Sequence, residues 1–274
     1  MQILKTLRGQ ILLIASGCLA LGLSVLMAAA YIASRSQAED ALAAQVQALA
    51  RTHAEGLRDW ARSKATIVEV ASTAANEPSP EPILARLKTA GGYITTYFGY
   101  ADKRTAFSSP QNLPSDYDPT SRPWYQQAAA SNTYVFTRPY QDAGGNGLVM
   151  TIARAIYEDG KVIAVAAGDV SIDAVVKSLA AVKPTPASYA FLVGGDGSII
   201  AHPDSKMTLQ PSTAIKPELT LAQLQALAQN GKPSAMQLQE RDILLTVSRV
   251  EGSDWLLAIA ADHGEAMQGI NTLL

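Results

Sequence analysis

The sequence predicts an α+β protein in which one membrane-spanning helix continues into a long helix, followed by two small α/β modules with antiparallel sheets. Three observations predict this fold: a charge-free apolar run near the N-terminus, an amphipathic stretch after it, and a strand pattern that occurs twice. The chain has 274 residues, 48% of them hydrophobic, which is enough for one large core or two ordinary ones.

The apolar run extends from Gly9 to Ala33 and follows Lys5 and Arg8. A helix needs about 20 apolar residues to cross a bilayer. Basic residues before such a span favour the cytoplasmic side. We therefore predict a cytoplasmic N-terminus (1–8), a transmembrane helix (9–33), and a remainder outside the cytoplasm. The alternative is a cleaved signal peptide, since Met27-Ala28-Ala29-Ala30 resembles a cleavage site, although a signal peptide's apolar region is typically about 7 to 15 residues.

Residues 34–75 are predicted to form one long stalk helix, because apolar side chains from Leu42 to Ala71 recur at helical spacing. At 1.5 Å per residue this helix would be about 60 Å long. Its apolar stripe could pack on the chain's own modules or against a second copy in a homodimer. The proline-rich run 76–82 ends the helix, and a short amphipathic helix over 83–89 is expected next.

Beyond the long helix, the order of predicted strands occurs twice, which indicates two modules in tandem. The predicted divisions are a membrane-distal module at 76–182 and a membrane-proximal module at 183–262. Each begins with a hairpin around an Asp-Lys or Asp-Gly turn. The matched pieces are the hairpins 96–107 and 189–201, the strands 148–154 and 243–249, and the next strands, which end at Asp169 and Asp262.

Residues 263–274 are predicted to begin a helix, and its last residues, Ile270, Leu273 and Leu274, are apolar. We expect this helix to lead into a second membrane span outside the sequence. Cytoplasmic signalling partners would then be reached through that missing part.

Composition excludes several classes of function. The net charge is -2 and no basic stripe is present, so nucleic acid is not an expected partner. Cys18 is the only cysteine, which excludes a disulfide or thiolate metal site within one chain. His53, His202 and His263 lack the spacing of a metal site or a catalytic motif, so neither an enzyme, a metal nor a cofactor is expected. A purely adhesive role would explain the stalk helix but not the polar set described next.

The insert 115–125 in the first module concentrates aromatic residues and an arginine, and two prolines within it restrict the loop. Arg122 can offer a bidentate fork to a carboxylate. Asp142 and Asp169 can meet an ammonium group. The sequence therefore predicts a site for a small zwitterion. The walls of this site would come from Tyr117, Trp124, Tyr125 and Tyr140.

Each of these residues also has a structural alternative. Arg122 could stack on Trp124 in a packing corner. Asp169 could cap the helix that follows it, as its counterpart Asp262 would. Asp142 lies in a turn-prone run, where aspartate is common for local reasons. Only the coincidence of all these residues favours a binding site.

Together the motifs resemble the double CACHE sensor domain of bacterial chemoreceptors, and most closely the amino-acid-sensing branch of the methyl-accepting chemotaxis proteins. The resemblance spans the chain and implies two PAS-like modules. The motifs that carry it are Tyr117-Asp118-Pro119, Arg122-Pro123-Trp124-Tyr125, Pro139-Tyr140-Gln141-Asp142 and Gly168-Asp169.

The resemblance implies a small-molecule ligand, an L-amino acid, bound in the membrane-distal module. It implies that Arg122 and Trp124 contact the carboxylate of the ligand and that Tyr117 assists. It also implies that four residues gather around the amino group: Tyr125, Tyr140, Asp142 and Asp169.

Side-chain selection is expected from Thr96, Tyr97 and Tyr100 on the first hairpin. Their aromatic content keeps an alternative open, because members with most of this motif bind polyamines, histamine or quaternary amines. The output could also be that of a histidine kinase or a cyclic-nucleotide enzyme instead of a chemotaxis transducer.

Overall fold

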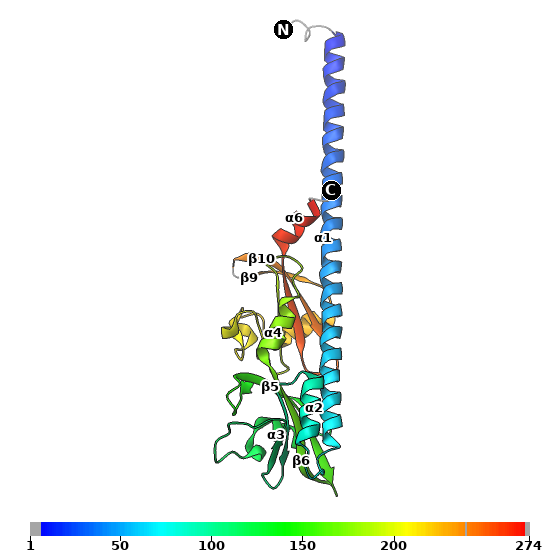
Figure 1. The fold of residues 1–274 in the computed structure, drawn as a ribbon. Helices are drawn as coiled ribbons and strands as arrows, with labels where there is room; N and C mark the ends of the chain where they lie inside the picture. Colours follow the sequence, from blue (N-terminus) through cyan, green and yellow to red (C-terminus); the bar gives the residue numbers. More distant parts are fainter. Residues whose placement is uncertain (1–6, 239, 272–274) are drawn as a thin grey trace.

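The computed structural model, shown in Figure 1, describes residues 7–238 and 240–271. The fold is α+β, as predicted, with one long helix and two antiparallel sheets. The predicted cytoplasmic residues 1–6 and the apolar Leu273 and Leu274 lie outside the described residues. Among the described residues, both sheets lie along the half of the long helix that is farther from the N-terminus (Figure 1).

Helix α1 (Leu7–Ser72) is continuous through the predicted transmembrane and stalk parts. In its N-terminal half, large apolar side chains are exposed; Leu26, for example, is 67% exposed. The helix from Ile14 onward is long and apolar enough to cross a membrane by length and composition. From Leu42 the apolar stripe is instead buried in the core of the chain's own modules, where Val46 is 1% exposed. The stripe therefore packs on the chain's own modules, which is the first of the two roles predicted for it.

The sheet of the module predicted to be membrane-distal, called the distal sheet, follows the short helix α2 (Glu81–Gly91). Its strand order is β2-β1-β6-β5-β3, with β4 also paired to β5, and all pairs are antiparallel. Helix α4 (Ile172–Ala180) follows β6 and connects the modules. The strands are β1 (Thr95–Tyr100), β2 (Thr105–Phe107), β3 (Val135–Phe136), β4 (Tyr140–Gln141), β5 (Leu148–Glu158) and β6 (Lys161–Ser171).

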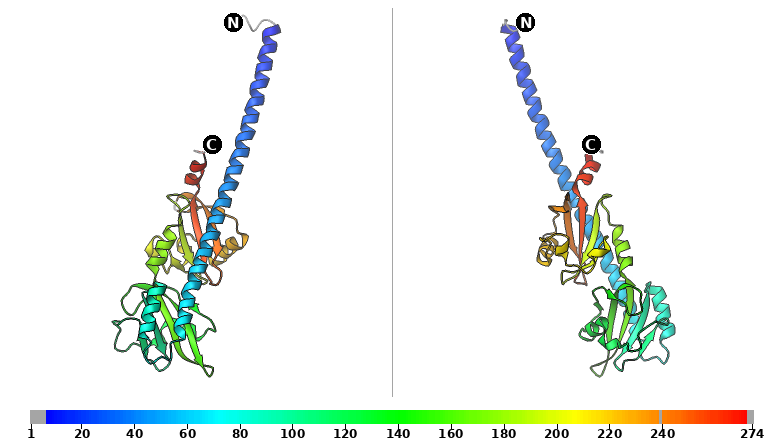
Figure 2. Two further views of the ribbon diagram at one scale, coloured as in Figure 1. Left: turned by 45° about the vertical axis from the view of Figure 1, so that its right-hand side comes forward. Right: turned by 90° about the vertical axis from the view of Figure 1, so that its left-hand side faces the viewer.

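The membrane-proximal sheet has the order β8-β7-β11-β10-β9 and repeats the hairpin-first arrangement of the distal one. Helix α5 (Leu221–Asn230) covers one face, and α6 (His263–Asn271) follows the last strand. Figure 2 shows α6 beside α1, pointing toward the same end of the molecule as the N-terminal half of α1. The strands are β7 (Tyr189–Val193), β8 (Ile199–Ala201), β9 (Ser234–Leu238), β10 (Arg241–Arg249) and β11 (Leu256–Asp262). Strands β3, β4 and β9 were not predicted from the sequence.

The two faces of each sheet belong to different cores, because successive side chains of a strand point to opposite sides. The faces toward α1 and α4 share one continuous core that includes Phe98 and Leu257. The opposite face of the distal sheet packs under α3 (Pro123–Ala129), around Trp124. The opposite face of the proximal sheet packs under α5, around Leu224. A site on the α3 side is therefore separated from α1 by the thickness of one sheet.

The two modules are joined near the start of β4 by a cluster of ion pairs. Arg138, two residues before Tyr140, contacts Asp254 at 2.5 Å and Asp196 at 3.0 Å. Its guanidinium lies so close to Gly194 that a Cβ there would be 2.4 Å from Cζ. A side chain at this position would therefore displace the Arg138 guanidinium from its present place.

Candidate functional site

The insert is held against the first hairpin by Asp118. Its carboxylate accepts hydrogen bonds from the backbone N–H (2.9 Å) and the hydroxyl (2.6 Å) of Thr120, and so caps the 3-10 helix Pro119–Ser121. The same carboxylate forms an ion pair with Lys103 at 2.8 Å, in the turn between β1 and β2. Pro123 then starts α3 at a helix position that suits proline, which places Arg122 just before the helix and Trp124 inside it.

Trp124 is 1% exposed and lies over the sheet at Gly99. A Cβ at Gly99 would be 2.5 Å from the Trp124 ring, so only glycine permits this approach. The indole meets the Tyr97 ring edge-on, with 4.9 Å between ring centroids. Trp124 therefore packs the insert against β1, where the absence of a side chain at Gly99 makes room for the indole ring.

Asp169 is the buried centre of the polar set and is 3% exposed. It lies on the central strand β6, in register with Thr95 on β1 and Thr151 on β5. Its Oδ1 accepts hydrogen bonds from Tyr97 at 2.9 Å and from Thr151 at 2.6 Å. The hydroxyls of Thr151 and Tyr140 lie 2.5 Å apart. Because both hydrogen bonds of Asp169 go to Oδ1, Oδ2 remains as an acceptor for a further donor.

Burial raises the pKa of Asp169 to about 7, although the hydrogen bonds from Thr151 and Tyr97 oppose the rise. Burial also raises the pKa of Tyr97, so its hydroxyl stays a donor. A carboxylate with this pKa changes charge near neutral pH. A positively charged partner at Oδ2 would favour its ionised form.

Arg122 lies across the pocket from the sheet, on the insert. Its guanidinium carbon is 5.7 Å from the centroid of the Tyr140 ring, and one of its nitrogens donates to the backbone oxygen of Gln141 at 3.4 Å. The ring it covers is thus that of Tyr140, so the alternative of a stack on Trp124 is wrong. With no carboxylate paired to it among the described residues, Arg122 keeps donors for an anion.

Asp142 stabilises a local turn and also lines the candidate pocket, so its position fits both roles considered for it from the sequence. Its carboxylate accepts from the backbone N–H (3.1 Å) and the side-chain amide (2.6 Å) of Asn146, which closes the turn before β5. The residue also lines the same small cavity as Arg122 and Asp169.

These side chains converge on one small cavity between the insert and the distal sheet. It encloses only about 10 Å³, the space of roughly one water molecule. Pockets for small organic ligands enclose about 300–1,000 Å³. Groups that line the cavity must therefore move apart to admit such a ligand. The lining residues are Thr95, Tyr97, Phe107, Gln111, Leu113, Tyr117, Arg122, Trp124, Tyr140, Asp142, Ala143 and Asp169.

Three of the predicted residues do not line this cavity. Thr96 donates to the backbone oxygen of Leu84 at 2.7 Å, and Tyr100 donates to that of Ala75 at 3.0 Å. Both belong to the face of β1 toward α1 and α2, whereas Tyr97 belongs to the pocket face, because side chains alternate along a strand. Tyr125 is 7% exposed and packs edge-on against Trp124, behind the cavity wall.

Thr151 is the polar neighbour of Asp169 that the sequence reasoning missed. It lies in the strand 148–154 that was matched between the modules, and the register of β5 against β6 places it directly opposite Asp169. Strand alternation could have selected it as a pocket-facing residue, but pairing between strands cannot be read from one sequence. Thr95 and Phe107, which also lie on paired strands, were missed for the same reason, whereas Gln111, Leu113 and Ala143 lie in loops whose path the sequence does not reveal.

Asp169 does not cap the following helix, so that alternative is wrong as well. Ser171 is the N-cap of α4 and accepts from the backbone N–H of Asp173 at 3.1 Å. In the proximal module Asp262 takes the equivalent position, accepting from the backbone N–H of Glu265 at 2.9 Å. The structural counterpart of Asp262 is thus Ser171, and Asp169 has a different role.

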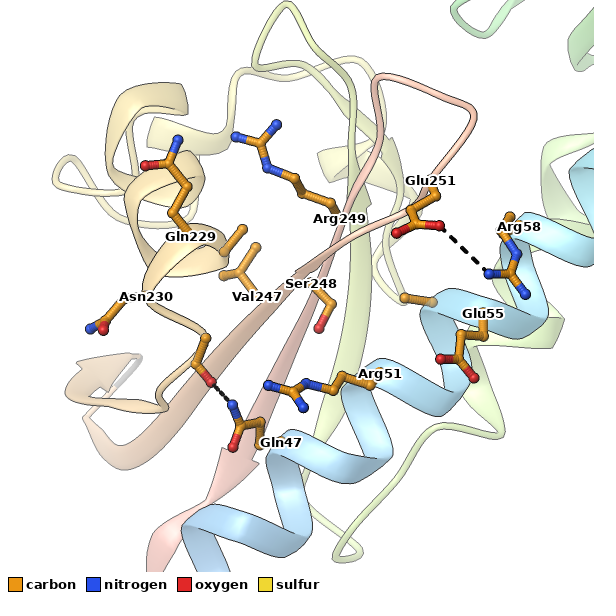
Figure 3. Close-up of a pocket in the computed structure, with 13 residues that line it drawn as sticks. Gln47, Arg51, Glu55, Arg58, Gln229, Asn230, Val247, Ser248, Arg249 and Glu251 are labelled. Carbon is orange, nitrogen blue, oxygen red and sulfur yellow. Dashed lines mark hydrogen bonds and ion pairs between the residues drawn. The ribbon is translucent and has the colours of Figure 1, made fainter.

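In the proximal module, leucines of α5 and its flank pack against the corresponding face of the sheet. A polar cleft of about 350 Å³ does lie between α1 and this module (Figure 3). It mixes charges of both signs, and Arg58 pairs across it with Glu251 at 3.6 Å. Gln47 donates to the backbone oxygen of Gly231, so the cleft joins α1 to the module.

Comparison with known proteins gives concordant matches. The dCache_1 family model, described as a Cache domain, matches residues 30–270. The methyl-accepting chemotaxis protein PctB of Pseudomonas aeruginosa is 31% identical over 220 residues, which are 78% of this chain and 34% of PctB. The chain therefore spans about a third of the length of this curated relative.

Solved structures are similar over most of the chain. The ligand-binding domain of PctB in complex with L-Arg has a TM-score of 0.69 and 27% identity, and the match covers 83% of this chain and 97% of that one. The ligand-binding domain of the Pseudomonas fluorescens chemoreceptor CtaA in complex with L-isoleucine has a TM-score of 0.74 and 23% identity, covering 86% and 98%. The CtaA likeness supports the fold.

Proposed function

Because the chain belongs to the dCache_1 family of Cache domains, we propose that it is the extracytoplasmic sensor of a bacterial chemoreceptor and binds an L-amino acid in its membrane-distal module. One observation carries the proposal: Arg122, which has no carboxylate partner among the described residues, and the buried carboxylate of Asp169 line the same cavity. These groups match the two charged ends of an amino acid. The names of the relatives, which are chemotaxis receptors, support binding and signalling instead of turnover.

In the proposed complex, Arg122 holds the ligand carboxylate with its bidentate fork, beside Trp124 and Tyr117. Oδ2 of Asp169 accepts from the ligand ammonium, next to the Tyr140 ring and Asp142. Tyr97, which donates to Asp169, limits the room for the ligand side chain and is the specificity residue that the structure supports best. The insert opens to admit the ligand and closes over it, which shifts the equilibrium between two states of the module.

The proposal is tested by thermal unfolding of the full chain in detergent micelles with the proteinogenic L-amino acids, polyamines, histamine and choline. A ligand that binds only the folded state at a hundred times its Kd stabilises it by about 2.7 kcal/mol, which raises the melting temperature. We expect stabilisation by one or several amino acids and none by the matching amino-acid amides. The proposal would be contradicted if no compound that carries both a carboxylate and an ammonium group raised the melting temperature.

A second candidate ligand class is amines without a carboxylate. The observation that favours it is the aromatic surrounding of Asp169, formed by Tyr97, Tyr140 and the nearby Trp124, because aromatic faces attract cations. In the same experiment this alternative predicts stabilisation by polyamines, histamine or choline and none by amino acids.

We further propose that α1 anchors the protein in the bacterial inner membrane and that the output lies in a cytoplasmic part reached through a second span. The exposed apolar surface of the N-terminal half of α1 supports the anchor. Fractionation of cells that express the chain should recover it with the inner membrane; recovery in the soluble periplasmic fraction would contradict the anchor and favour a cleaved signal peptide.

A homodimer through α1 is proposed as well. It cannot use the Leu42 stripe, which is buried within the chain, and must use the opposite, exposed face. In a Cys18→Ser background, Ala48→Cys on that face is expected to form a disulfide-linked dimer in membranes, and Lys161→Cys, exposed at the far end of the distal sheet, is not. Absence of the Ala48→Cys cross-link would contradict this dimer. The exposed face includes Ala41, Ala44, Ala48 and Thr52.

A further inference from the structure

A second cavity lies on the opposite side of β6 from the candidate amino-acid pocket. It encloses about 390 Å³ between α1, α4 and the segment that joins α2 to β1. Helices α1, α2 and α4 are labelled in Figure 1. Its size falls within the range of pockets for small organic ligands. The lining residues are His53, Gly56, Leu57, Trp60, Lys64, Gly92, Tyr93, Ile94, Val170, Ser171, Ala174, Val175, Ser178, Leu179 and Val182.

The walls of this cavity are mainly apolar, and none of its lining residues is acidic. Leu57 and Trp60 face it from α1, and Val175 and Leu179 face it from α4. The hydroxyls of Ser171 and Ser178 add weak polarity at one side. Such walls suit the apolar body of a ligand, because burying apolar surface contributes about 25 cal/mol per Å².

Lys64 is the only lysine or arginine among the residues that line the cavity, and it is only 9% exposed. Its ammonium donates to the backbone oxygens of Gly91 and of Gly92, the latter at 3.3 Å. The Tyr93 ring centroid is 4.7 Å from Nζ and that of Trp60 is 5.6 Å away. No carboxylate pairs with Lys64 among the described residues, and burial lowers its pKa.

A buried ammonium without an anionic partner is unusual, because isolated buried charges are costly. Its three N–H donors exceed the two carbonyl oxygens that it contacts, so one donor is free for a ligand. An anion at this position would gain a charge-assisted hydrogen bond and would compensate the charge of Lys64. A neutral or cationic ligand would not compensate the charge of Lys64.

The cavity adjoins the strand that carries Asp169. Side chains alternate along β6, so Asp169 faces the amino-acid pocket and Val170 faces this cavity. The backbone N–H of Ile94 donates to the backbone oxygen of Asp169 at 2.8 Å. Tyr93 packs so tightly under β6 that a Cβ at Gly168 would be 2.6 Å from its ring. A ligand between α1 and α4 would therefore contact the back of the same strand.

We propose that this cavity is a second binding site, for a small organic monocarboxylate with an apolar aromatic or branched aliphatic body. Lys64 binds the carboxylate, and the apolar side chains of α1 and α4 hold the body of the ligand. The site is separate from the amino-acid pocket and does not depend on the function proposed for that pocket.

The test is calorimetric titration of the full chain in detergent micelles with 3-phenylpropanoate and with its uncharged analogue 3-phenylpropanamide. We expect the carboxylate to bind at least tenfold more tightly than the amide. Lys64→Met should weaken carboxylate binding at least tenfold, and Ala174→Trp, which fills the mouth of the cavity while leaving Lys64 in place, should abolish it. Lys177→Met, an exposed lysine on α4 outside the cavity, is the matched control and should leave binding unchanged.

Arg122→Ala separates this site from the amino-acid pocket, since the guanidinium there could also hold a carboxylate. We expect Arg122→Ala to leave 3-phenylpropanoate binding intact. The proposal is overturned if the unmodified chain does not bind this probe, if Ala174→Trp leaves binding unchanged, or if Arg122→Ala abolishes it. Lys64 also contacts the end of α2, so its replacement can affect folding. If Lys64→Met does not fold, the binding measurement on Ala174→Trp tests the proposal alone.

Discussion

Replacing Asp169 by asparagine is expected to weaken amino-acid binding about a hundredfold or more and, at the same time, to stabilise the ligand-free protein at neutral pH. Removing one partner of a buried charge pair costs about 2–5 kcal/mol of binding free energy. A factor of a hundred corresponds to about 2.7 kcal/mol. The ligand ammonium loses its carboxylate, while the amide keeps the shape of the site and accepts hydrogen bonds from Tyr97 and Thr151.

The expected gain in stability follows from the raised pKa of Asp169. An unfolded aspartate has a pKa of about 3.9, and in the fold burial raises it to about 7. Between these values the folded state keeps a proton that the unfolded state has lost, so the free energy of unfolding falls as pH rises. The contribution of Asp169 to the free energy of unfolding is fully present below about pH 4 and is lost as pH rises through about 7. The loss is on the order of 4 kcal/mol.

The measurement combines denaturant unfolding at pH 4 to 8 with calorimetric titration of the amino acid found in the screen. Asp169→Asn should flatten the pH dependence of stability and raise the unfolding midpoint above that of the unmodified protein at pH 8. Amino-acid affinity of the unmodified protein should fall about tenfold per pH unit below 7, because protonation of Asp169 competes with the ligand.

Asp173→Asn is the matched control, because this carboxylate is exposed near the start of α4 and lies outside the pocket. It should leave affinity unchanged. The role assigned to Asp169 would be contradicted if the Asp169→Asn variant bound the amino acid with normal affinity. It would also be contradicted if the variant were less stable than the unmodified protein at pH 8.

Replacing Arg122 by alanine is expected to weaken amino-acid binding by roughly thirtyfold to a few thousandfold, which corresponds to about 2–5 kcal/mol for a lost partner of a desolvated charge pair. Fold stability should change little, because the side chain is only partly buried and donates only one long hydrogen bond, 3.4 Å, to Gln141. Arg122→Lys should recover only part of the affinity, since lysine keeps the charge but lacks the planar fork.

The ligand class decides the meaning of the Arg122→Ala titration. Loss of amino-acid binding with unchanged binding of a carboxylate-free amine assigns Arg122 to the carboxylate. Equal weakening of both would show that Arg122 acts through the shape of the insert. Arg104→Ala serves as the control, because this exposed arginine lies on the same hairpin as the pocket strand β1 but pairs with Asp102 at 2.7 Å, outside the cavity.

Much of the fold is determined locally, which is why the sequence predicts it. The apolar run after Gly9 and the helical spacing from Leu42 to Ala71 specify a continuous α1, and the Asp-Gly turn at Asp196 specifies a hairpin. The short strands β3, β4 and β9 were not predicted. They add to the edge regions of the sheets, so pairing with an existing strand contributes more to them than their own residue pattern.

The sequence by itself determined the composition of the site: Arg122 and Trp124 on a proline-restrained insert, with Asp142 and Asp169 as candidate carboxylates. The tertiary structure decided which side chains meet. Strand alternation turned Tyr97 into the pocket and Thr96 and Tyr100 away from it. Register across β5 and β6 supplied Thr151, and burial within the sheet raised the pKa of Asp169. The physical reason is that residue type sets what a side chain can bind, whereas register, facing and desolvation depend on partners that are distant in the chain.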